Sequence, residues 1–348
     1  MKVKHTIISG TNYWNPGDDF VRWGTVNIFK ELLPDYQMNF LFYNFNPTFF
    51  PQAKHKASNL FSVGDMEKIK DDIDMIIVPG LSGGTEVVDL YSWILRNKLE
   101  SKVFLIGGGY ENSYIDGNLN GNAELQRIFQ NAKILIGRTK RHPAIIDKFG
   151  IKYHHLNCPA LLSNPSEKYI DDNKIEKILF SIQIPDNNPL GIVNQHTPAK
   201  KVADTLEILK WLYAQKYELG MIAHYKTEYF YYLDLFKKLG LDIPIMFSSF
   251  VEDYKGIYSQ YDAVVSTRLH ACIYGNSLGM PSFLINSTPR HLESGAGIVH
   301  LNILQSLAQF TDKLNHYKTL SLRDVATDLH DFKKNLKDDY VKILKPII

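Results

Sequence analysis

Short apolar runs alternate with longer amphipathic stretches along most of this chain, and this alternation constrains its fold more than any other feature. In the first half, strand and helix candidates follow one another regularly, which favours a parallel sheet covered by helices on both faces. The predicted strands are Thr6–Ser9, Met38–Tyr43, Met75–Val78, Val103–Ile106, Ile134–Gly137 and Tyr153–Leu156. The predicted helices are Phe20–Leu33, Met66–Asp71, Thr85–Asn97, Asn122–Ala132 and His142–Phe149.

The same rhythm restarts after a polar, proline-containing break at residues 163–168. The predicted strands there are Ile178–Ile182, Tyr217–Ile222, Ile245–Phe247, Ala263–Ser266 and Ser282–Ile285, and the predicted helices are Lys200–Lys216, Glu228–Leu239, Val251–Gln260 and Leu269–Leu278. We therefore predict an α/β chain of two Rossmann-like domains, residues 1–165 and 166–322, which face each other across a ligand-binding cleft. Residues 323–348 are predicted as a C-terminal helix that packs back on the N-terminal domain.

The composition of the 348 residues narrows the classes of partner. The net charge is +2, and the sequence has no block of Lys and Arg, so it does not predict nucleic-acid binding. Two cysteines are too few for a disulfide framework or a zinc cage, so a reducing, cytoplasmic setting is expected. No apolar run approaches the ~20 residues that cross a bilayer, so no integral membrane segment is predicted. A homo-oligomer is left open.

The segment after the first predicted strand carries Asn15, Gly17 and Asp18. Gly17 permits a tight turn, and Asp18 or Asp19 can cap the helix that follows, so a plain capped connection is one interpretation. The other interpretation is that Asn15 and Asp18 bind substrate hydroxyls, with Asp18 as a base.

Two glycine clusters follow later strands of the first half, one beginning at Gly80 and one at Gly107. Glycine lets the backbone approach a ligand, and it exposes N–H groups at a helix start, which suits anions or sugar oxygens. The candidate binding residues in these clusters are Gly83, Gly84, Gly108, Gly109, Glu111 and Asn112.

An arginine and a histidine, Arg268 and His270, follow the predicted strand Ala263–Ser266. Open α/β sheets bind ligands outside the carboxyl ends of their strands, so both side chains are candidates for a site. A fixed cation and a titratable imidazole at this place suit an anionic substrate and a proton transfer. Arg138 and Arg290 also follow predicted strands and are further candidates for contact with an anion.

Several common site motifs are absent from the sequence. Neither G-x-G-x-x-G nor G-x-x-x-x-G-K-[ST] occurs, so NAD and P-loop ATP binding are not predicted. The metal motifs H-E-x-x-H and C-x-x-C and the nucleophile elbow G-x-S-x-G are absent as well. We therefore expect no metal site.

Taken in order, these segments resemble the polysaccharide pyruvyl transferase family over residues 5–300. Asn15-Pro16-Gly17-Asp18 is similar to the family's N-x-G-D, and Ile136-Gly137-Arg138 is similar to its arginine strand. Arg268-Leu269-His270, followed by Gly279-Met280-Pro281, is similar to its R-L-H and G-x-P signature, the most specific part of the resemblance. Cys158 stands where many members carry an aspartate, and Leu81-Ser82 interrupts the first glycine cluster.

The resemblance implies a fold like that of the two-domain GT-B glycosyltransferases. It also implies the transfer of a pyruvyl group from phosphoenolpyruvate to two hydroxyls of a cell-surface sugar, with release of phosphate. Arg268, Arg138 and Arg290 would then clamp the donor. His270 would act as acid or base, and Asp18 or Glu111 would hold the acceptor hydroxyls. Phosphoenolpyruvate would be a substrate, so no cofactor is expected.

Two alternatives accompany this expectation. One is a GT-B glycosyltransferase that uses a nucleotide sugar, which also needs a basic residue near a diphosphate. The other is a non-catalytic sugar-binding relative that has kept the fold.

Overall fold

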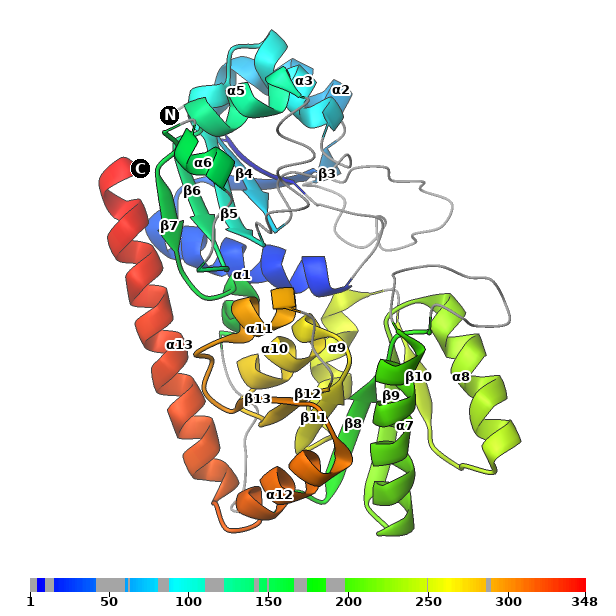
Figure 1. Cartoon of the computed structure of the whole chain (residues 1–348). Coiled ribbons are helices and arrows are strands. Elements are labelled where there is room, and N and C mark those ends of the chain that lie inside the picture. Colours follow the sequence, from blue (N-terminus) through cyan, green and yellow to red (C-terminus); the bar gives the residue numbers. More distant parts are fainter. Residues whose placement is uncertain are drawn as a thin grey trace. The chain divides into compact units, whose positions relative to one another are not determined.

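The computed structural model divides the chain into two units, Met1–Ser163 with Asn335–Ile348, and Asn164–Lys334. The structure describes residues 5–9, 16–41, 60–61, 63–80, 88–109, 122–140, 144–148, 150–165, 174–185, 198–248, 250–285 and 289–348. Each unit contains one parallel sheet with helices packed on it (Figure 1). The predicted class, an α/β chain of two Rossmann-like, GT-B-like domains, is therefore confirmed.

The sheet of unit 1 has the strand order β3-β2-β1-β4-β5-β6-β7, and every pairing in it is parallel. Its strands are β1 His5–Ser9, β2 Gln37–Leu41, β3 Leu60–Phe61, β4 Ile73–Pro79, β5 Val103–Gly108, β6 Ile134–Gly137 and β7 Tyr153–His155. Apart from Asp74, all residues of β4 are buried, as expected for an interior strand of a parallel sheet.

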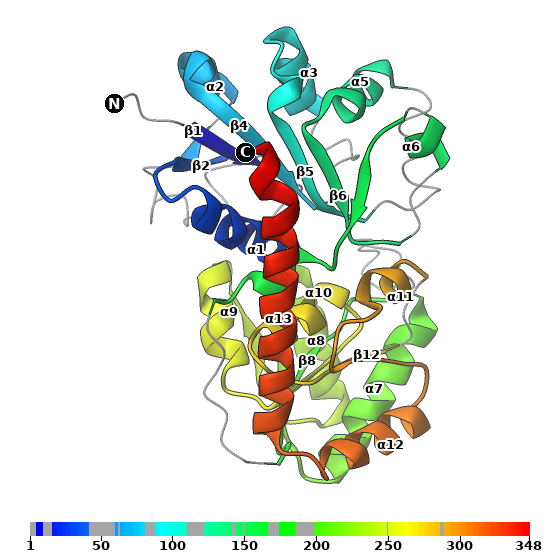
Figure 2. The ribbon, with the colours of Figure 1, turned by 90° about the vertical axis from the view of Figure 1, so that its left-hand side faces the viewer.

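Helices cover both faces of this sheet (Figures 1 and 2). The helical segments are α1 Pro16–Leu32, α2 Val63–Ile69, η3 Lys70–Asp72, α3 Val88–Arg96, η5 Glu100–Lys102, α5 Ala123–Asn131, α6 Ala144–Lys148 and η6 Pro159–Leu162. Apolar side chains of α2, α3 and α5 form one core with alternate residues of β4 and β5, such as Val103 and Leu105. The intervening residue Phe104 points to the other face, where its ring contacts Phe29 of α1 edge-on.

Helix α1 packs closely against η6, and Gly24 makes this approach possible. A Cβ atom at Gly24 would lie 1.7 Å from the carbonyl oxygen of Pro159, which is backbone and cannot swing away. We expect Gly24→Ala to lower the free energy of unfolding by about 1–3 kcal/mol, the usual cost of overpacking. Chemical denaturation would measure the change.

A matched control is Gly256→Ala in helix α9, Val251–Tyr258, where a Cβ would meet nothing within 4 Å. That substitution should be neutral or stabilising by up to ~1 kcal/mol, because alanine is the better helix former. Equal effects of the two substitutions would contradict the close packing of α1 on η6.

The sheet of unit 2 has the order β10-β9-β8-β11-β12-β13 and is also parallel throughout. Its strands are β8 Lys177–Ser181, β9 Glu218–Ala223, β10 Ile245–Phe247, β11 Ala263–Ser266, β12 Ser282–Ile285 and β13 Leu301–Leu304. Its helices are α7 Ala199–Ala214, α8 Lys226–Leu239, α9 Val251–Tyr258, α10 Leu269–Ser277, α11 Pro289–Gly295 and α12 Leu307–Tyr317. Apolar residues of α7, α8 and α12 form one core with alternate strand residues such as Phe180, Val265 and Phe283.

The long helix α13, Leu322–Leu344, contributes residues up to Lys334 to unit 2 and the remainder, with η7 Lys345–Ile347, to unit 1. Within unit 1, the Tyr340 hydroxyl donates to the carbonyl of Asn157 at 2.9 Å. Residues 322–334 of α13 thus group with unit 2, and residues 335–344 group with unit 1. The division into domains at residues 165 and 322 stays a prediction. Across the described residues, no helix is both long enough and apolar enough to span a membrane.

Candidate functional site

The strand order of unit 2 reverses at β8, because β9 and β10 lie on one side of it and β11, β12 and β13 on the other. In open α/β sheets, ligands bind outside the carboxyl ends of the strands at such a switch point. Arg268 follows β11 directly at this edge of the sheet. The prediction of a candidate anion site after Ala263–Ser266 thus falls at the place where this fold binds ligands.

Hydroxyl groups fasten the turn after β11 to the end of β8. The Ser266 hydroxyl donates to the carbonyl of Ser181 at 2.6 Å and accepts from the backbone N–H of Arg268 at 2.8 Å. The Thr267 hydroxyl accepts from the backbone N–H of Gln183 at 2.9 Å. All five residues in these hydrogen bonds are buried, so the bonds fix the position from which the Arg268 side chain starts.

The Arg268 guanidinium forms a buried ion pair with the carboxylate of Glu228 in α8. The two side chains are 7% and 1% exposed. The second carboxylate oxygen of Glu228 accepts from the backbone N–H groups of His224 at 2.9 Å and Tyr225 at 3.3 Å. The guanidinium carbon lies 5.1 Å from the centre of the Tyr225 ring, within range of a cation–π contact.

This environment decides the charge of the groups around Arg268. Burial by itself would lower the pKa of Arg268, but the adjacent carboxylate of Glu228 outweighs it and the pKa is raised, so the guanidinium is charged. Burial, and then the charge of Arg268, lower the pKa of His224 well below its usual range. The His224 imidazole is therefore neutral near pH 7.

Lys201 is a second buried cation at the same edge, on the first turn of α7. It is 4% exposed, and its ammonium group has no carboxylate partner among the residues that the structure describes. Burial and then the positive charge of Arg268 lower the pKa of Lys201 to about 8. The sequence does contain a signal for this residue, because Lys201, Thr205, Ile208 and Leu212 share the buried stripe of α7.

His270 is the second residue of α10 and is partly buried. It follows Arg268 by two positions, so both residues stand at the start of the same helix. Burial raises the pKa of the neighbouring Cys272 thiol, which keeps this thiol protonated. The part of His270 in acid–base chemistry stays a prediction. Arg290 lies in α11, and the direction of its side chain is outside the described part of the structure.

Unit 1 has its own switch point at β1, which lies between β2 and β4. Helix α1 begins at this edge, so Gly17 and Asp18 lie in its first turn, with Gly17 buried and Asp18 partly exposed. Gly80, at the end of β4, has a φ of 83°, a conformation that favours glycine. Asn15, Gly83 and Gly84 lie outside the described residues.

The glycine cluster after β5 lies beside the arginine that follows β6. A Cβ at Gly109 would lie 3.0 Å from Nη2 of Arg138, so glycine allows this guanidinium to pack on the backbone next to Gly108. Arg138 is 2% exposed, and its Nη1 lies 3.8 Å from Sγ of Cys158. The structure thus brings Gly109, Arg138 and Cys158 together. Glu111 and Asn112 lie outside the described residues.

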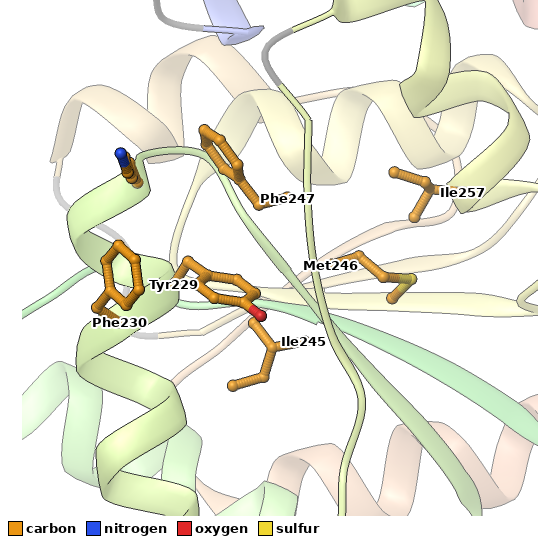
Figure 3. Close-up of a pocket in the computed structure, with 7 residues that line it drawn as sticks. Tyr229, Phe230, Ile245, Met246, Phe247 and Ile257 are labelled. Carbon is orange, nitrogen blue, oxygen red and sulfur yellow. The ribbon is translucent and has the colours of Figure 1, made fainter.

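A surface pocket of about 490 Å³ lies elsewhere in unit 2, between α8 and the edge strand β10 (Figure 3). Tyr229 and Phe230 line it from α8, Phe247 from β10 and Ile257 from α9. Among its described lining residues, Lys226 and Tyr229 alone carry polar side chains, so the pocket suits binding better than proton transfer. Within the same described ranges, no group of three or more His, Cys, Asp or Glu side chains is placed to hold a metal ion.

Solved structures with a similar fold include UDP-N-acetylglucosamine 2-epimerases. The enzyme from Methanocaldococcus jannaschii, in complex with UDP-GlcNAc and UDP, is 13% identical with a TM-score of 0.57, over 92% of this chain and 94% of that chain. The enzyme from Neisseria meningitidis, bound to UDP-GlcNAc, is 11% identical with a TM-score of 0.56, over 94% and 99%. That from Rickettsia bellii is 12% identical with a TM-score of 0.56, over 99% and 96%. At these identities the likeness shows the fold alone.

A comparison with curated proteins gave no match. The sequence profile of a family described as polysaccharide pyruvyl transferase matches residues 15–289. This range runs from Asn15 past the R-L-H segment at Arg268, which confirms the resemblance seen in the motifs. With a match over most of its length, the chain belongs to the polysaccharide pyruvyl transferase family and is a transferase.

Proposed function

We propose that the chain transfers a pyruvyl group from phosphoenolpyruvate to two hydroxyls of a sugar in a cell-surface glycan or its precursor. The products are a pyruvyl ketal and phosphate. The observation that carries the proposal is the buried, charged Arg268 at the switch point of the unit 2 sheet, inside the family's R-L-H segment. Its Nε is buried and donates to no described residue, so the guanidinium retains a donor for a ligand.

The reaction needs a proton at one carbon of the donor and two additions at its neighbour. Protonation of the methylene carbon makes the adjacent carbon electrophilic, and the first sugar hydroxyl adds there and loses its proton. The bond from that carbon to the phosphate oxygen then breaks, and phosphate leaves with the electron pair. The second hydroxyl adds and loses its proton, which completes the ketal.

Each residue role follows from these steps. Arg268 would hold the negative charge of the donor and of the departing phosphate. His270 would transfer the protons, because an imidazole can both accept and donate a proton. Asp18, in the first turn of α1, would bind or deprotonate an acceptor hydroxyl.

The direct test incubates the protein with phosphoenolpyruvate and a panel of sugars and glycans, and measures phosphate release together with the mass of the pyruvylated product. Release that depends on both substrates supports the proposal. Turnover of a nucleotide sugar, with no reaction of phosphoenolpyruvate on any acceptor, would favour the GT-B glycosyltransferase alternative. Glycan binding without either reaction, unaffected by His270→Ala, would favour a non-catalytic relative.

Replacing Arg268 with lysine tests the donor contact. We expect Arg268→Lys to weaken binding of phosphoenolpyruvate by at least about tenfold, because a charge-assisted hydrogen bond is worth ~1.5–3 kcal/mol and lysine cannot reproduce a bidentate contact. Isothermal titration calorimetry with the donor alone would measure the affinity. Unchanged affinity, in a variant shown to be folded by circular dichroism, would remove Arg268 from the donor site.

A further inference from the structure

Lys201 occupies a place that is electrostatically unfavourable in three ways. It is buried at 4% exposure without a carboxylate partner among the described residues. Its ammonium group is close enough to Arg268 for the two positive charges to repel each other. It also stands in the first turn of α7, where the helix dipole disfavours a cation. A position that breaks several local rules at once indicates a functional requirement.

Among the residues that the structure describes, the charges around Lys201 do not balance. Arg268 and Glu228 neutralise each other, and His224 is neutral near pH 7. The Cys272 thiol, on α10, stays protonated because burial raises its pKa. The charge of Lys201 is therefore left over in a buried region, where an uncompensated charge is costly. An anion from outside the protein would balance it.

Several features of the same edge favour a phosphate group as that anion. Helices α7, α8 and α10 all begin at the carboxyl edge of this sheet, and helix N-termini attract phosphate. The Arg268 Nε is a buried donor to which the described residues offer no acceptor. A phosphate dianion carries more charge than Arg268 alone can compensate, because Arg268 already shares its charge with Glu228.

We propose that Lys201 and Arg268 together form a two-cation phosphate site at the switch point of unit 2. This inference rests on the proposed function in one respect, since it assigns the bound phosphate to phosphoenolpyruvate. Lys201 then contacts the donor and supplies the second positive charge. Its ammonium group gains a counter-ion, which the described residues of the free protein do not provide.

Proton uptake on binding is the sharpest test. The Lys201 ammonium, with a pKa of about 8, is half protonated at pH 8, and a bound phosphate would draw it to the fully charged form. Isothermal titration calorimetry of the full chain at pH 8, in two buffers of different ionisation enthalpy, gives the number of protons taken up. We expect the wild type to take up about half a proton more than Lys201→Arg, since arginine is always charged.

The comparison with Lys201→Arg separates the proton uptake by Lys201 from that by other groups. His270 and the donor phosphate itself can also take up protons, but they do so equally in both proteins. Lys201→Met should lose at least about tenfold in affinity for phosphoenolpyruvate and inorganic phosphate. Lys200→Met is the matched control, because Lys200 is 80% exposed and paired with Asp204, and it should bind like the wild type. Equal proton uptake in wild type and Lys201→Arg would overturn the proposal.

The melting temperature gives a readout without ligand. The pKa of Lys201 is lower in the folded chain than its ordinary 10.5, so below pH 8 the charged lysine opposes folding. Lys201→Met should therefore melt above the wild type at pH 7. The difference should shrink as the pH rises from about 8 towards 10.5, where the unfolded wild-type chain binds more protons than the folded one. Identical melting temperatures at pH 7 would contradict an unbalanced buried cation.

The two proposals can fail separately. The probes are phosphoenolpyruvate, inorganic phosphate and UDP. Binding of phosphate or UDP with the Lys201-dependent proton uptake, but no binding of phosphoenolpyruvate, would keep the two-cation site and reject the donor. Binding of none of the three anions by the wild type would reject the site itself.

Discussion

Replacing Glu228 with leucine should lower the free energy of unfolding by about 3–5 kcal/mol, the usual cost of leaving one member of a buried ion pair uncompensated. Glu228 is 1% exposed and receives hydrogen bonds from Arg268 and from the backbone of His224 and Tyr225. The substitution leaves the buried guanidinium of Arg268 without its counter-ion and leaves both N–H groups without their acceptor. Urea denaturation monitored by circular dichroism would measure the loss.

A second substitution shows whether the cost comes from the stranded charge. Glu228→Leu combined with Arg268→Met should recover most of the lost stability, because replacing both members of a buried pair by apolar residues is often neutral. Asp234→Leu is the control on the same helix, since its ion pair with Lys238 is exposed and should matter little. A Glu228→Leu variant as stable as the Asp234→Leu variant would show that the buried pair does not stabilise unit 2.

Replacing His270 with alanine should lower turnover by about 10²-fold or more, the usual scale for a group that transfers a proton in the rate-limiting step. The substitution removes the one imidazole in the family's R-L-H segment and leaves Arg268 in place. The measurement is phosphate release from phosphoenolpyruvate at saturating donor and acceptor. A fall in kcat with little change in KM would agree with a role in the chemical step.

The control for His270 is His330→Ala, an exposed position on α13 that should leave turnover unchanged. The pH dependence gives a second readout, because a titrating acid or base should shape the profile of kcat against pH. Turnover near that of the wild type in His270→Ala would remove this residue from the mechanism and leave another group to supply the proton.

Apolar runs in the sequence located most strands, because interior strands of parallel sheets are buried on both faces. Met75–Val78 lies within β4, and Ala263–Ser266 coincides with β11. The strand β13, Leu301–Leu304, was not predicted, and its sequence explains why. Asn302 interrupts the apolar pattern of this strand. Two residues of β13 are only partly buried, because β13 is at the edge of the sheet.

Of the candidate site, the sequence predicts the parts that depend on neighbouring residues in the chain. A strand followed by an arginine and a helix placed Arg268 at the edge of the sheet, because that signal lies within one segment. Glu228 lies 40 residues away from Arg268 on another helix. No short sequence pattern could predict that these two side chains are in contact. The sequence predicts Lys201 within a helix, but its burial near Arg268 depends on how α7 packs on the sheet.

The carboxylate of Glu228 also bears on how quickly a phosphate product could leave. A site with two full positive charges would hold phosphate tightly, and slow product release limits many enzymes. The carboxylate of Glu228 forms an ion pair with the guanidinium of Arg268. Its negative charge therefore weakens the attraction between Arg268 and a bound phosphate. A departing phosphate therefore leaves behind an arginine that still has a partner, so that of the two cations Lys201 alone would lose its counter-ion at the end of each catalytic cycle.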